Sequence, residues 1–249
     1  MSVAQVLFAA LMLFLGSTAL SATGFGIGMV AIPGLLFVLE PQTAVVVLNT
    51  IALSIEAWIV AQARKDLPLR EIMPVVLAGA VGVPLGVYIL KFAEPSAMRI
   101  GVSILVLGLA AIAPLKFQRD FRYSRVVGML AGLFVGIVLP AFGVGGPLVT
   151  LFLLTRNWQR QSVRAGMALY LLVLDVFGVA GYAIAGLYSV ERLTLISFMI
   201  LPMLAGLALG TVLLDRMSER VFRYVVVAII LSSSLLLLVR ELTDLVGSR

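Results

Sequence analysis

The sequence predicts an all-α polytopic membrane protein made of two inverted-topology repeats of five elements each, with four full helices and one short broken helix per half. Three observations lead to this fold class. Of the 249 residues, 62% are hydrophobic and only 12% are charged, about half the charged share of a soluble domain. Apolar runs close to the ~20 residues that cross a bilayer as a helix recur along the whole chain. A glycine-rich string occurs once in each half.

The apolar runs give the elements in order. Full-length segments are expected near residues 3–22, 43–63, 71–90, 97–115, 125–140, 162–187, 193–214 and 221–239. Two further segments, near 29–39 and 147–155, are apolar but short, and each directly follows a glycine string. A helix of about 11 residues rises only ~16 Å, about half of the hydrocarbon core, so neither spans the membrane alone.

The basic residues indicate how the chain is threaded. If each short segment carries the chain to the other side, the 18 lysines and arginines divide 13 to 5 between the two faces. If the short segments return to their own side, the division is 10 to 8. The positive-inside rule favours the first arrangement. It predicts a multi-pass protein of the bacterial cell inner membrane with both termini in the periplasm.

An internal repeat links the two halves. The string Phe25–Gly28 matches Phe142–Gly145 at an offset of 117 residues. Later matches keep their order while the offset drifts to 119 and then 124: Gln42, Thr43 and Glu56 with Gln161, Ser162 and Asp175, then Gly82 and Gly86 with Gly206 and Gly210. Five elements per half force the second half to be inverted relative to the first. We expect an N-terminal repeat over 1–115, a cytoplasmic linker over 116–124 and the inverted C-terminal repeat over 125–249.

The glycine strings predict the substrate site. Glycine lets the backbone leave the helical region, and a proline follows each string, Pro33 and Pro147. Broken helices at equivalent places of two inverted halves are typical of a transporter's binding site. The helix starts after the breaks would point free N–H groups at an anion. The residues expected to bind it here are Gly24, Phe25, Gly26, Gly28, Phe142, Gly143, Gly145 and Gly146. Close helix packing is the alternative explanation for these glycines.

Polar residues inside the apolar segments extend the candidate site. Gln42, Thr43, Gln161 and Ser162 either cap helices or donate hydrogen bonds to substrate, whereas Asn49 and Tyr170 lie deeper and are expected to line the cavity. Glu56 and Asp175 each lie 14 residues after a glutamine of their own half. They predict proton coupling or gating, unless Glu56 simply reaches water at the interface. Arg164 attracts the anion or extends to the membrane surface.

Taken together, these residues resemble the TauE/SafE family, the sulfite exporter family. The resemblance rests on Gly24–Gly28 and Gly143–Gly146 with their prolines, the two-half layout, the small size and the basic central loop. It implies export of sulfite, or of organosulfonates such as sulfoacetate, across the bacterial inner membrane. Thr150 stands where a proline mirroring Pro33 is expected, so the two half-sites are not equivalent.

The function predicted from the sequence is therefore a secondary transporter that exports a small anion by alternating access. An anion channel, or a carrier for a different anion such as a carboxylate, is the alternative. The chain has no cysteine and no histidine, which excludes imidazole or thiolate metal sites and Ser-His or Cys-His nucleophiles, so we expect no enzyme and no cofactor. The expected partners are the anion, the lipid bilayer and a coupling ion such as the proton, with no nucleic acid; a homodimer is left open.

Overall fold

The structure is a computed structural model that describes residues 2–23, 27–112, 124–146, 149, 153, 158–216 and 219–247. Within these ranges every regular element is helical, which confirms the all-α prediction. The helices are α1 (Val3–Thr23), α2 (Ile27–Leu35), α3 (Pro41–Gln62), α4 (Leu69–Phe92), α5 (Pro95–Ile112), α6 (Ser124–Phe142), α8 (Arg160–Ile184), α9 (Val190–Arg216) and α10 (Glu219–Gly247), with a 3-10 turn at Arg64–Asp66. Each long helix lies close to its predicted position, and α10 extends further toward the C-terminus than expected.

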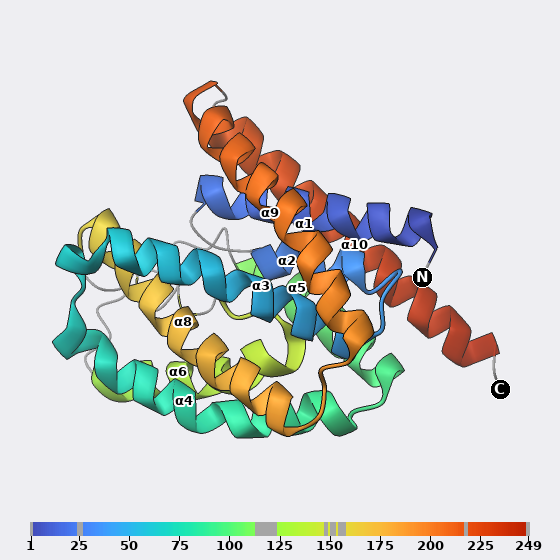
Figure 1. Cartoon of the computed structure of the whole chain (residues 1–249), viewed down its shortest axis with the longest axis horizontal. Coiled ribbons are helices and arrows are strands. Elements are labelled where there is room, and N and C mark those ends of the chain that lie inside the picture. Colours follow the sequence, from blue (N-terminus) through green and yellow to red (C-terminus); the bar gives the residue numbers. More distant parts are fainter. Residues whose placement is uncertain are drawn as a thin grey trace.

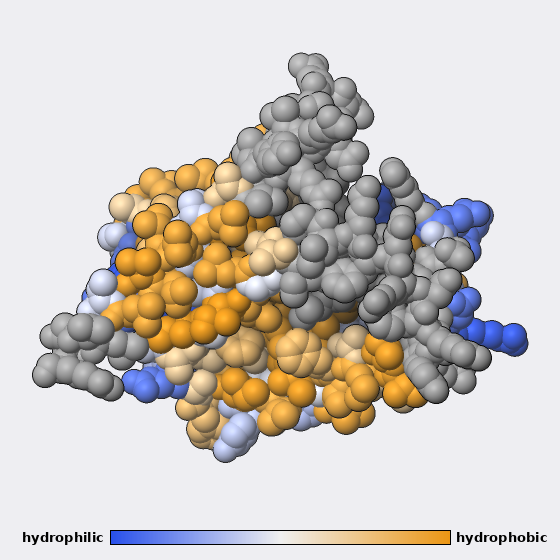
Figure 2. Space-filling view, turned by 180° about the vertical axis from the view of Figure 1, so that it is seen from behind, coloured by the Kyte–Doolittle hydropathy of each residue, from blue (hydrophilic) through white to orange (hydrophobic). Residues whose placement is uncertain are grey.

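The surface of the bundle is that of a membrane protein. Five of the described helices, α1, α3, α4, α8 and α9, are long and apolar enough to cross a bilayer. On α4 the exposed stripe is formed by Leu77, Val81, Leu85, Tyr88 and Phe92, all at least half exposed. Among the coloured residues of the face in Figure 2, hydrophobic ones predominate, and hydrophilic ones lie toward the edges. An apolar surface this extensive is stable only against lipid or a protein partner.

Four helix pairs build the bundle: α4 packs on α6, α1 on α9, α3 on α8 and α5 on α10 (Figure 1). Glycines set the two tightest contacts. A Cβ atom on Gly82 of α4 would lie 2.6 Å from the carbonyl oxygen of Leu133 on α6. A Cβ atom on Gly206 of α9 would collide with the carbonyl oxygen of Phe14 on α1. These glycines let the helix backbones approach closely.

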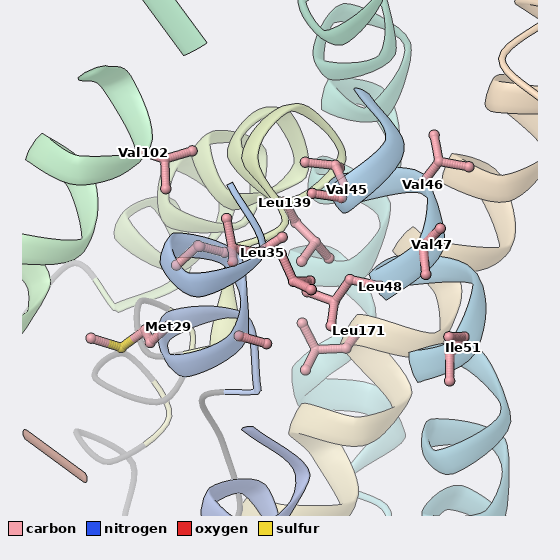
Figure 3. Packing of buried hydrophobic residues seen from close by; sticks show 14 of the residues in the cluster. Met29, Leu35, Val45, Val46, Val47, Leu48, Ile51, Val102, Leu139 and Leu171 are labelled. Atoms are coloured by element: carbon pink, nitrogen blue, oxygen red, sulfur yellow. The ribbon is translucent and has the colours of Figure 1, made fainter. Parts of the chain in front are cut away.

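The core lies where α2, α3, α6 and α8 meet. On α3 the four consecutive residues Val45–Leu48 are all at most 1% exposed, so the first half of this helix is buried on every side and lies at the centre of the bundle. The short helix α2 is equally enclosed, because all its residues from Gly28 to Leu35 are buried. Figure 3 shows Leu48, Leu139 and Leu171 pointing toward one another from α3, α6 and α8. The two central helices, α2 and α3, are thus the ones that carry the predicted site residues of the first half.

Candidate functional site

The helix break of the second half follows α6. Gly143 has a φ of +70°, a left-handed conformation that glycine adopts without strain, and its N–H donates to the Leu139 carbonyl at 2.8 Å. This is the usual glycine termination of a helix. Helical structure resumes at Gly146 and is described again at Val149 and Leu153. The predicted interruption is therefore three residues long, from Gly143 to Gly145.

The start of α2, which follows the glycine string of the first half, meets the break of the second half. Gly24, Phe25 and Gly26 lie outside the described residues, but α1 ends at Thr23 and α2 begins at Ile27. A Cβ atom on Gly28 would collide with the carbonyl oxygen of Gly143. In the opposite direction, a Cβ atom on Gly143 would lie 2.7 Å from the Cδ1 atom of Ile32. The start of α2 thus packs directly against the turn that ends α6, and glycine is required on both sides.

A cavity opens beside this contact. Its empty volume is about 670 Å³, including the part that is open to the outside, so this figure is an upper bound on the room for a ligand. Most of the wall is apolar and comes from α2, α3, α6 and α8; Figure 3 shows four of these residues, Met29, Leu48, Leu139 and Leu171. The other lining residues that concern the site are Gly28, Asn49, Glu56, Gly143, Gly145, Gly146, Arg164 and Asp175.

Two buried carboxyl groups lie in the cavity wall. Glu56 of α3 is 9% exposed and Asp175 of α8 is 2% exposed. Both side chains line the same cavity, on two helices that pack against each other. No N–H or O–H group of the described residues donates to Oε2 of Glu56. The sequence placed these residues at equivalent positions of the two halves, and the antiparallel packing of α3 on α8 brings them together.

Arg164 marks one end of the cavity. It lies near the start of α8, where α3 ends, and it is exposed. It lines the cavity but forms no ion pair within the described part of the chain. Eleven residues separate Arg164 from Asp175 along α8, a rise of about 16 Å. We refer to this opening as the Arg164 end.

Toward the opposite end the cavity is closed by a buried hydrogen-bond network. Asn49 Nδ2 donates to the Leu139 carbonyl at 3.3 Å and to the Tyr182 hydroxyl at 3.0 Å. The Tyr182 hydroxyl donates to the Pro140 carbonyl at 2.8 Å. Tyr182 is completely buried and Asn49 is 1% exposed. Both amide hydrogens of Asn49 are therefore used within the protein, which ties α3, α6 and α8 together beside the break. We call these three side-chain bonds the inner seal.

A second layer of polar contacts lies beyond the inner seal, where α3 begins and α8 ends. The hydroxyls of Thr50 and Tyr188 are 2.7 Å apart, and burial raises the pKa of Tyr188, which keeps its proton in place. Arg192 Nε donates to Thr43 Oγ1 at 3.0 Å, and its Nη2 donates to Gln42 Oε1 at 3.4 Å. Gln42 in turn donates to the carbonyls that end α4, Leu90 at 3.2 Å and Lys91 at 3.0 Å. We refer to this end as the Arg192 end.

The structure separates the predicted site residues into two groups. Gly28, Gly143, Gly145, Gly146, Asn49, Glu56 and Asp175 line one cavity. Gln42, Thr43, Gln161, Ser162, Tyr170 and Phe142 do not line it. None of the four polar residues caps the start of its own helix, because Glu40 and Gln159 occupy the N-cap positions and neither start has a side-chain cap. Gln42 instead bonds the last carbonyls of α4.

Tyr170 lies in a helix interface instead of the cavity wall. Its hydroxyl donates to the Gly132 carbonyl of α6 at 2.7 Å, and its ring is fully buried. Conversely, sequence reasoning missed Tyr182 and the bridging role of Arg192. Tyr182 has Ala63 as its counterpart at the 119-residue offset, so the repeat gave no signal for it.

The described residues hold no group of three or more acidic, cysteine or histidine side chains that could bind a metal ion. Comparison with known proteins gives one match. A family model described as "Sulfite exporter TauE/SafE" matches residues 8–237, which is most of the chain. Neither the curated proteins nor the solved structures give a match.

Proposed function

The chain belongs to the TauE/SafE sulfite exporter family, and on this premise we propose that it exports a small anion, sulfite or an organosulfonate, across the bacterial inner membrane by alternating access. The observation that carries the proposal is the contact at one cavity between Gly28, at the start of α2, and the break that follows α6. Gly28 and Gly143–Gly146 bring backbone to its wall. The start of α2 adds N–H groups and a positive dipole end. Arg164 is the basic residue that lines the cavity among those described.

Helix packing supports the inverted repeat on which alternating access depends. Gly82 faces the Leu133 carbonyl, and its repeat counterpart Gly206 faces the Phe14 carbonyl. Leu133 and Phe14 are 119 residues apart, an offset already present in the repeat. If the two halves are related by a two-fold axis, the packing of α4 on α6 corresponds to the packing of α9 on α1. Both pairs are among the closest in the bundle.

The two ends of the cavity support a particular state of the transport cycle. The Arg164 end is lined by an exposed residue, whereas the Arg192 end is closed by the inner seal and by the contacts of Arg192. In the threading favoured by the positive-inside rule the Arg164 end faces the cytoplasm. We therefore infer an inward-facing carrier in which the inner seal breaks when the site opens to the periplasm.

Counterflow in proteoliposomes tests this function. Vesicles loaded with unlabelled sulfite are expected to accumulate radiolabelled sulfite transiently above its outside concentration, because a carrier exchanges one anion for another. Sulfoacetate, taurine, sulfate and acetate inside the vesicles then rank the substrates. Downhill leak without counterflow would indicate a channel instead, and exchange with acetate alone would make the substrate a carboxylate.

The proposed threading makes a separate prediction. Because both termini are placed in the periplasm, alkaline phosphatase fused after residue 249 is expected to be active, and a fluorescent protein fused there is expected to remain dark. The matched fusion follows Lys65 in the basic turn after α3. There the phosphatase is expected to be inactive and the fluorescent protein is expected to fluoresce. A fluorescent C-terminal fusion would contradict the ten-element arrangement.

A further inference from the structure

We propose that binding of an anion in the cavity adds a proton to the Glu56–Asp175 pair, so that the anion and the proton cross the membrane together. This inference rests on the proposed function and specifies its coupling ion. It begins with the chemistry of the pair. Glu56 and Asp175 lie in one cavity wall and both are buried. Two buried carboxylates in one site oppose each other's ionisation, so the pair retains one proton and has room for a second.

The position of Glu56 and Asp175 makes their ionisation depend on the charge of a ligand in the cavity. Both side chains line it, and both are more than nine-tenths buried. Oε2 of Glu56 receives no hydrogen bond from a described N–H or O–H group, so nothing within the described protein compensates a negative charge there. An anion entering the same cavity increases the cost of that charge, because like charges in one site oppose ionisation. When the carboxyl pair takes up a proton from solution, its negative charge is neutralised and the repulsion of the anion is removed.

The surroundings contain few other groups that could respond. Apart from Arg125 at the start of α6, no residue of α1, α2 or α6, which pack around the cavity, is ionisable. On α4 and α9 the described charged residues lie near the helix ends: Arg70, Glu71, Lys91, Glu191 and Arg192. On and after α8 the groups are Arg164, which lines the cavity, and the hydroxyls of Tyr170, Tyr182 and Tyr188. The three tyrosine hydroxyls are held in hydrogen bonds, which leaves the carboxyl pair as the proton acceptor.

The charge balance then predicts how transport is driven. One monovalent anion together with one proton carries no net charge. The flux of a permanent monoanion is therefore expected to be insensitive to membrane potential and to depend on the pH gradient. Without the proton, the same anion carries a negative charge and responds to the potential.

Isethionate is the appropriate probe, because its sulfonate stays a monoanion over the whole range and sulfite does not. Its affinity for the purified protein is expected to rise as the pH falls from about 9 to about 5, where buried carboxyl groups titrate. The slope is expected to approach tenfold per pH unit, the limit for uptake of one proton. A pH-indicator dye in weak buffer is expected to report alkalinisation of the medium when isethionate is added to the wild-type protein.

The double variant E56Q/D175N keeps the size of both side chains and removes the titration. It is expected to bind isethionate with little dependence on pH, and its flux is expected to follow a potassium-valinomycin potential. E191Q, which alters an exposed carboxylate at the start of α9, is the matched control and is expected to behave as wild type. Binding that is independent of pH in the wild type, or dye traces that show proton release, would overturn the proposal even if the double variant does not fold. Sulfite counterflow distinguishes this failure from failure of the transport function, which would remove both proposals.

Discussion

Replacement of Gly28 by valine is expected to abolish anion transport, lowering the sulfite flux in proteoliposomes about a hundredfold. The Cβ atom of any other residue at this position would collide with the carbonyl oxygen of Gly143. A main-chain atom in a tight turn cannot rotate away as the end of a side chain can, so α2 must move. Overpacking of this kind costs about 1–3 kcal/mol, and the upper value corresponds to about a hundredfold change in an equilibrium. Movement of α2 separates Gly28 from Gly143, and both residues line the cavity.

Gly108→Val is the control for this experiment. Gly108 lies on α5, and a Cβ atom there would meet nothing within 4 Å, so the substitution adds the same side chain without a collision. It is expected to leave both transport and thermal stability in detergent close to wild type. If Gly28→Val folds and transports sulfite normally, the contact between the start of α2 and the break that follows α6 has no role in the cycle.

The helices and the pairing of the halves could be predicted because they depend on patterns along the chain. Apolar runs of membrane length gave the positions of α1, α3, α4, α5, α6, α8 and α9 within a few residues. The break at Gly143 follows from a left-handed conformation that glycine adopts readily. Glu56 and Asp175 were found because the same type of side chain recurs at the same place in each half.

The side-chain partners could not be predicted in this way, because they are chosen by packing between distant segments. Thr43 has a donor 149 residues away, in Arg192, and no periodicity of α3 indicates that contact. Asn49 lines the cavity as expected, but its amide hydrogens serve the Leu139 carbonyl and the Tyr182 hydroxyl. Where α6 stops at a glycine, the Leu139 carbonyl accepts from both the Gly143 N–H and Asn49, and the Pro140 carbonyl accepts from Tyr182, because buried carbonyls must find donors. The glycine string predicts the break, but it does not indicate which side chains donate to these carbonyls, so the inner seal was not predicted.

Replacement of Tyr182 by phenylalanine is expected to open the cavity toward the Arg192 end. The variant removes one hydroxyl and leaves the Pro140 carbonyl without its donor and Asn49 without one acceptor. Each buried hydrogen bond contributes about 1 kcal/mol, so the closed state loses about a tenfold to thirtyfold advantage over the open one. The natural chain has no cysteine, so a single Ala168→Cys substitution in the cavity wall reports access without further changes.

In sealed vesicles, a membrane-impermeant thiol reagent is expected to label Ala168→Cys only from the Arg164 end when Tyr182 is present. Adding Tyr182→Phe is expected to raise the labelling rate from the Arg192 end at least tenfold, with little change at the Arg164 end. Tyr88→Phe is the control, because Tyr88 is exposed on α4 and its ring contacts Phe92. If labelling from the Arg192 end is already fast with Tyr182 in place, the inner seal does not close the cavity. If both rates stay unchanged in the variant, Tyr182 stabilises the helix contact without controlling access, and the barrier lies in the outer contacts of Arg192.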